Sequence, residues 1–170
     1  MFYVKQKNKA IFAYFFLLIT IYNQTDCIRK ISLGGKHKKH PMKVLTYGTF
    51  DLFHYGHQNL FDNMVRLLGK NVEIYVGISS DTFNLIKNKK AIDSFETRSN
   101  NVKKHPNITE TFVENSWEQK IEDIKRIKPD FFIMGSDWTG KFDHLNKFCK
   151  VVYLPRTPEI SSTMLRLQSQ

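Results

Sequence analysis

The chain has 170 residues, enough for one domain of typical size. Hydrophobic residues make up 41% of it and charged residues 25%, an ordinary globular mixture that argues against a disordered protein. The net charge of +10 does not indicate a nucleic-acid-binding domain, because residues 1–41 carry eight Lys or Arg against one acid, whereas residues 42–170 carry eighteen against fifteen.

The first 41 residues differ in composition from the rest of the chain. Three lysines precede a thirteen-residue apolar run, Ala10 to Tyr22, which is short for a membrane span of about 20 residues and has no cleavage site after it. Three interpretations are open: upstream sequence from a misassigned start, a membrane-associating extension, or a signal or transit segment. We favour the first, because Met42 directly precedes the first expected strand. The predicted parts are an extension of residues 1–41 and a single domain of residues 42–170.

Apolar runs and helical periodicities alternate along this domain. The lysine-rich segment 84–93 predicts a basic loop between them. The two cysteines have no metal-type or disulfide spacing: Cys27 lies in the extension, and Cys149 is expected to be a reduced, buried thiol on a helix. Strands alternating with helices predict an α/β, Rossmann-like, doubly wound parallel sheet with ligands at the carboxyl ends of its strands. The expected strands are residues 44–47, 72–78, 108–113, 131–134 and 151–154, and the expected helical segments are 56–68, a turn after 79–81, 94–104, one after 116–119 that stops before 129, one near 142–148, and a last one within 155–170.

The first strand–helix junction contains the motif His54-Tyr55-Gly56-His57. A helix N-terminus offers free backbone N–H groups and a positive dipole end, both suited to phosphate. Gly56 lets a phosphate approach the backbone closely, and two imidazoles there can donate hydrogen bonds to oxygens that gain charge in a phosphoryl transition state. The motif, in this context, indicates a phosphate-handling site.

From Met42 to about Arg166 the sequence resembles the H-x-G-H nucleotidyltransferases and, more closely, the glycerol-3-phosphate cytidylyltransferase family. H-x-G-H alone specifies only the superfamily, and the later blocks point to CTP and glycerol phosphate. The segments that carry the resemblance are residues 46–57, 79–84, 87–90, 117–120, 134–143 (MGSDWTGKFD) and 151–163 (VVYLPRTPEISST).

The resemblance implies roles for individual residues. Two basic-loop lysines would close over phosphates, an arginine would face the substrates, and the loop after residue 134 would bind cytosine. The implied catalytic residues are His54, His57, Lys87 and Arg156. The implied nucleotide-binding residues are Thr49, Phe50, Gly56, His57, Asp137, Trp138, Arg156, Thr157, Ser161, Ser162 and Thr163. The implied substrate-binding residues are Lys87, Lys89 and Arg98, and no protein metal cage is expected.

The reaction that the resemblance implies is direct in-line transfer from CTP to glycerol 3-phosphate, giving CDP-glycerol for teichoic-acid or capsule-type polymers. Mg²⁺ would be bound mainly through the nucleotide phosphates. The family pairs through this domain, so the resemblance implies a homodimer, although the residues alone give no oligomeric state. Because both substrates are cytoplasmic metabolites, we expect a cytoplasmic protein without membrane contact.

The sequence departs from the family pattern at three positions. Pro106 stands where the family has a second arginine, and Lys104 or His105 could substitute for that arginine only without its planar fork. Ser162 replaces a threonine and Ser136 replaces an acid. The first departure leaves open a weakly active or non-catalytic nucleotide-binding relative. Another specificity, such as ethanolamine phosphate as acceptor or adenylyl transfer, is also open.

Overall fold

A computed structural model of the chain describes residues 40–168. Except for its last two residues, the predicted extension lies outside the described residues, as do its apolar run and Cys27. The first strand begins at Met42. Among residues 40–168, no helix is both long enough and apolar enough to cross a membrane.

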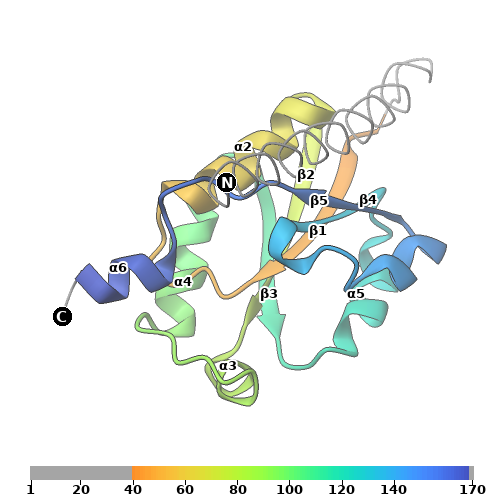
Figure 1. Cartoon of the computed structure of the whole chain (residues 1–170). Coiled ribbons are helices and arrows are strands. Elements are labelled where there is room, and N and C mark those ends of the chain that lie inside the picture. Colours follow the sequence, from red (N-terminus) through yellow and green to blue (C-terminus); the bar gives the residue numbers. More distant parts are fainter. Residues whose placement is uncertain (1–39, 169–170) are drawn as a thin grey trace, which may run out of the picture. The chain divides into compact units, whose positions relative to one another are not determined.

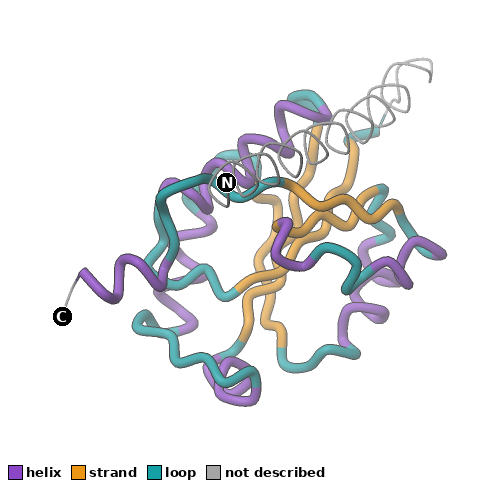
Figure 2. The backbone as a smooth tube through the Cα atoms, viewed as in Figure 1, coloured by secondary structure: helices purple, strands orange, loops and turns teal. Residues whose placement is uncertain are grey.

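Five parallel strands form one sheet in the order β3-β2-β1-β4-β5. Figure 2 shows the strands side by side through the centre, with the helices outside them. The order reverses direction between β1 and β4, so the topological switch point lies there, and the predicted fold class is confirmed. The strands are β1 (Met42–Gly48), β2 (Val72–Ser79), β3 (Ile108–Glu114), β4 (Phe131–Gly135) and β5 (Lys150–Leu154).

The helices cover both sides of the sheet, with α2 and α4 on one side and α5 on the other (Figure 1). The helical segment expected near residues 142–148 is present as a 3₁₀ helix, but the prediction that Cys149 lies on a helix was wrong, because it lies in the bend that follows. The Cys149 thiol is buried, as predicted, and its burial raises its pKa to about 11. The helices are α2 (Tyr55–Leu68), α3 (Asp81–Ile86), α4 (Phe95–Lys103), α5 (Gln119–Ile127), η1 (Ser136–Trp138), η2 (Asp143–Lys147) and α6 (Ser162–Gln168).

One face of the sheet packs against α5 and η2. Tyr47 belongs to this core, and its hydroxyl donates a hydrogen bond to Asp123 Oδ2 on α5 at 2.8 Å. The ring passes so close to β2 that a Cβ at Gly77 would overlap it. The core residues on this face are Leu45, Tyr47, Ile124, Ile127, Phe132, Met134, Phe142, Leu145, Cys149, Val151 and Tyr153.

Helix α4 packs through polar as well as apolar groups. Its buried residues are Arg98, Ser99 and Val102, and the Ser99 hydroxyl lies 2.9 Å from the Thr111 hydroxyl on β3. Hydrogen bonds to groups on other elements therefore compensate for the few apolar residues of this helix.

Candidate active site

Two adjoining cavities of about 290 and 180 Å³ open at the carboxyl ends of β1 and β4. This is the switch point of the sheet, where parallel α/β folds bind ligands. The larger cavity continues toward the lysine loop and α6, and the smaller one toward the start of α2. The residues that line both are Tyr47, Gly48, Thr49, Phe50, His57, Met134, Asp137, Trp138, Arg156 and Ser162.

The two histidines are anchored by the backbone at the start of α2. His54 is the N-cap, and its Nδ1 accepts a hydrogen bond from Gly56 N at 3.1 Å. His57 Nδ1 accepts in turn from His54 N at 3.4 Å, and the two rings stack with centroids 3.9 Å apart. Because each Nδ1 is an acceptor, each neutral ring carries its hydrogen on Nε2 and can donate it to a ligand oxygen.

The surroundings keep both rings neutral. Burial lowers the pKa of His57 to about 3, with further lowering by His54 and Arg156, while Asp51 opposes the shift. Burial and Arg156 also lower the pKa of His54. At neutral pH this pair therefore offers two neutral donors rather than two positive charges.

Close packing fixes the turn between β1 and α2. Phe50 and Leu52 have positive φ angles of 54° and 47°, which residues other than glycine rarely adopt. The buried Phe50 ring packs against His57 with centroids 5.2 Å apart. A Cβ at Gly56 would lie 2.8 Å from Ile160 and 2.9 Å from the His54 ring. Only glycine fits there without moving a neighbour.

The end of β4 faces the loop that follows β5. Asp137 and Trp138 lie in η1, and Arg156 donates to Asp137 Oδ2 at 2.8 Å. Trp138 packs against Trp117 with ring centroids 5.8 Å apart. The predicted residues Asp137, Trp138 and Arg156 line both cavities, so the structure brings them together.

The hydroxyl residues before and in α6 reach the same cavities. Ser162 Oγ donates to the carbonyl oxygen of Asp51 at 2.7 Å, which ties α6 to the turn after β1. Thr157 lines the smaller cavity and accepts from Asn59 at 3.3 Å, whereas Ser161 and Thr163 line the larger one.

The basic loop brings two predicted lysines to the larger cavity. Lys87 Nζ donates to Ser79 Oγ at 2.5 Å, and Lys89 Nζ lies 5.7 Å from the centre of the Trp138 ring. Burial lowers the pKa of Lys87 to about 8, although Glu114 opposes the shift. The loop is shorter than predicted, because α3 continues to Ile86.

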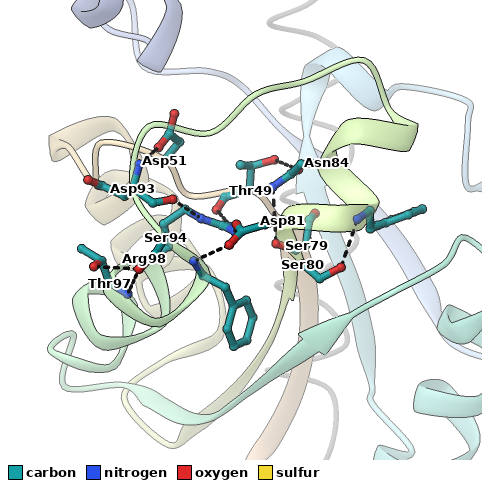
Figure 3. Close-up of polar contacts among 12 residues, drawn as sticks. Thr49, Asp51, Ser79, Ser80, Asp81, Asn84, Asp93, Ser94, Thr97 and Arg98 are labelled. Atoms are coloured by element: carbon teal, nitrogen blue, oxygen red, sulfur yellow. Dashed lines mark hydrogen bonds and ion pairs between the residues drawn. The ribbon is translucent and has the colours of Figure 1, made fainter.

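Arg98 is the predicted site residue that the structure does not bring to either cavity. Its side chain is fully buried and lies between three segments (Figure 3). It donates to Asp93 O at 3.1 Å, to Thr49 O at 2.6 Å and to Asp81 Oδ1 at 2.6 Å. The guanidinium therefore links the turn after β1 to residues 81 and 93, which lie on either side of Lys87 and Lys89 in the chain. The expectation that Arg98 faces the substrates is therefore not met in this structure.

Pro106 and its neighbours also lie away from the two cavities. Lys104, His105 and Pro106 line a separate hollow with Phe53, Gln58 and Asn101. His105 Nε2 lies 3.1 Å from an oxygen of Asp62. Neither Lys104 nor His105 reaches the site in place of the missing arginine.

Sequence reasoning gave no site role to several residues that line the larger cavity, among them Glu114, Trp117, Lys120 and Arg166. Arg166 donates to Asp51 Oδ2 at 2.8 Å, and its Nε is buried with no hydrogen-bond partner among the described residues. Its position four residues after Ser162, on the same face of α6, could have identified it. No sequence spacing indicates that Glu114 and Lys120 meet.

Three carboxylates line the larger cavity, and each has a cationic partner. Asp51 pairs with Arg166, Asp137 pairs with Arg156, and Glu114 pairs with lysines. In the described part of the chain, no three His, Cys, Asp or Glu side chains are grouped so as to hold a metal ion.

The architecture defines a class of protein. A parallel sheet presents neutral histidine donors at a helix N-terminus, beside a cavity rich in cations, as transfer of a nucleotidyl group requires. A model of the cytidylyltransferase-like family matches residues 45–168. The chain belongs to this cytidylyltransferase-like family, and its class is that of the nucleotidyltransferases.

Proteins of similar sequence point to one kind of nucleotidyltransferase. Glycerol-3-phosphate cytidylyltransferase of Bacillus spizizenii is 48% identical over 126 residues, which cover 73% of this chain and 94% of that protein. The enzyme of the same name from Staphylococcus aureus is 40% identical over 124 residues, covering 73% and 92%. A lipopolysaccharide core biosynthesis protein from Thermoplasma volcanium shares the fold, with a TM-score of 0.56 at 19% identity over 68% of this chain and 98% of that one.

Proposed function

We propose that this protein converts CTP and glycerol 3-phosphate to CDP-glycerol and pyrophosphate. A phosphate oxygen of glycerol 3-phosphate forms a bond to the α-phosphorus of CTP, and the bond from that phosphorus to the β-phosphate oxygen breaks. No side-chain nucleophile is needed, so positioning and charge stabilisation supply the rate. The observation that carries the proposal is the 48% sequence identity to the glycerol-3-phosphate cytidylyltransferase of Bacillus spizizenii, over 94% of the length of that enzyme.

The site residues divide these tasks. The Nε2–H groups of His54 and His57 donate to oxygens of the triphosphate and the departing pyrophosphate. Arg156, which lines both cavities, supplies positive charge to the same oxygens, and Lys87, which lines only the larger one, supplies it to the phosphate of glycerol 3-phosphate. The shared lining around Asp137 and Trp138 receives the cytosine, while the turn at Thr49 and Phe50 and the hydroxyls of Thr157, Ser161, Ser162 and Thr163 bind the nucleotide.

Mg²⁺ accompanies the nucleotide in this proposal. Each carboxylate that lines the larger cavity is already paired with a cation, which favours binding of the metal through phosphate oxygens. The metal would supply charge neutralisation to those oxygens. The product would feed synthesis of teichoic-acid or capsule-type polymers in the cytoplasm, and the enzyme would act as a homodimer.

Pyrophosphate release by the full chain tests the proposal. Each of the four nucleoside triphosphates is combined with glycerol 3-phosphate, ethanolamine phosphate and choline phosphate, with and without Mg²⁺. We expect CTP with glycerol 3-phosphate and Mg²⁺ to give the fastest release, with CDP-glycerol as the product by mass spectrometry. Faster turnover with ATP, or turnover of another acceptor but not of glycerol 3-phosphate, contradicts the proposal. Binding of CTP without any turnover indicates a non-catalytic relative.

A further inference from the structure

Glu114, at the end of β3, is a buried carboxylate on the wall of the larger cavity. Three donors from other segments surround it. Lys120 Nζ and Ser79 Oγ donate hydrogen bonds to its two oxygens, the latter at 2.6 Å, and Lys87 Nζ lies 3.7 Å away. Ser79 also accepts from Lys87, so the hydroxyl links the lysine to the carboxylate. Glu114 therefore fixes two ammonium groups that come from different parts of the chain.

Aromatic rings complete the surroundings of both ammonium groups. Lys120 Nζ lies 4.5 Å from the centre of the Tyr47 ring and 4.8 Å from that of Trp117. Lys87 Nζ lies 4.5 Å from the centre of the Phe83 ring and 5.7 Å from that of Trp117. The rings limit where each ammonium group can lie while favouring its positive charge.

The charges of this cluster do not cancel. Two lysines and one glutamate leave one net positive charge in a region where the Lys87 and Lys120 side chains are only 9% and 4% exposed. Buried charge without a partner is unfavourable, so an incoming anion would be stabilised there. A phosphate monoester, which carries close to two negative charges, has the complementary chemistry.

The position of the cluster indicates which substrate it meets. Glu114, Lys87 and Lys120 line only the larger cavity, whereas His54 lines only the smaller one and His57 lines both. If the α-phosphorus lies beside His57, the attacking group approaches it from the larger cavity. That group belongs to the acceptor.

We propose, on the basis of the function proposed above, that Glu114 is a positioning residue that holds Lys87 and Lys120 together to bind the phosphate group of glycerol 3-phosphate. Lys120 is then a binding residue for the acceptor, and Trp117 is the shared wall of this subsite. Glu114 itself acts only through the two lysines.

The test compares Glu114→Gln with the wild-type chain and with Glu110→Gln. Glu110 lies on the same strand and pairs with Arg126 on the surface, so it is a matched control away from the cavities. We expect Glu114→Gln to raise KM for glycerol 3-phosphate at least about tenfold, the scale for losing one hydrogen bond to a charged group. KM for CTP should change less than about twofold. Because Glu114 raises the pKa of Lys87, its loss should also move the alkaline fall of kcat/KM to lower pH.

Several outcomes would overturn this inference. They are an increase confined to KM for CTP, an unmoved alkaline fall, or equal effects of Glu114→Gln and Glu110→Gln. If Glu114→Gln does not fold, Ser79→Ala replaces it, since it removes the linking hydroxyl without stranding a charge; an unchanged KM for glycerol 3-phosphate in that variant also overturns the inference. A wild-type chain that makes no CDP-glycerol contradicts the proposed function itself, before any variant is compared.

Discussion

His54 and His57 are held by the backbone of the helix that they begin, whereas Lys87 and Lys120 are held by side chains from other segments. The histidines are short, neutral and separated by only two residues. The lysines are long and charged, and they meet through Glu114 on a third element. One site therefore combines a local, neutral half, the histidines, with a long-range, charge-paired half, the lysines. The two halves should respond differently to substitution and to pH.

Substituting the histidines should give the largest effect. We expect His54→Ala and His57→Ala each to lower kcat by at least about 10²-fold, the scale for losing one preorganised donor, with a smaller change in CTP affinity. Steady-state kinetics measures both values. His144→Ala in the exposed η2 helix is the control, and it should keep wild-type kcat. A kcat near the wild-type value in either site variant would show that the histidines only cap α2.

Loss of the Arg98 guanidinium should disturb the junction between the two halves. Arg98→Met removes the donor to the carbonyls of Thr49 and Asp93 and leaves Asp81 without its cationic partner. We expect the free energy of unfolding to fall by at least about 2 kcal/mol, since one hydrogen bond of a charged group contributes about 1.5–3 kcal/mol and three are lost. Urea denaturation measures the change. Arg66→Met, on the exposed face of α2, should change it by less than about 0.5 kcal/mol. A kinetic defect in Arg98→Met without loss of stability would instead support direct contact with the substrates.

The pH profile separates the lysine half from the histidine half. Burial lowers the pKa of Lys87 to about 8, so its ammonium form is lost as the pH rises through that value. We expect kcat/KM for glycerol 3-phosphate to fall above pH about 8. Lys87→Arg keeps its charge at higher pH and should abolish this fall, although its different geometry lowers the absolute rate. An alkaline fall that persists unchanged in Lys87→Arg would assign it to another group. His57, with a pKa of about 3, should cause no change between pH 5 and 8.

The sequence predicts the local half of the site better than the long-range half. Strand–helix alternation and the H-x-G-H spacing predict the sheet and the β1–α2 junction, because both follow from neighbours in sequence. The burial of Arg98 and the meeting of Glu114 with Lys120 and Lys87 depend on how separate elements pack, which no spacing shows. The resemblance pointed to the lysine loop, and the structure places Lys87 and Lys89 of that loop on the larger cavity. The resemblance also implied a place beside the substrates for Arg98, whose side chain is instead buried away from both cavities.

The smallest effect is expected at Pro106, which stands where the family has a second arginine. Pro106 lies beyond the end of α4 and lines a separate hollow with Gln58 and Lys104, so an arginine there would not enter either cavity of the described fold. We therefore expect Pro106→Arg to change kcat/KM for both substrates by less than about twofold, in line with the small effects of substitutions away from a site. Lys104→Arg, in the same hollow, is the matched control because it adds a guanidinium at a neighbouring position. A rise in kcat/KM that is specific to Pro106→Arg would mean that this hollow joins the site in the working enzyme. It would also add a third cationic element to the charge-paired half. An unchanged rate would confine that half to Lys87, Lys120 and their shared carboxylate.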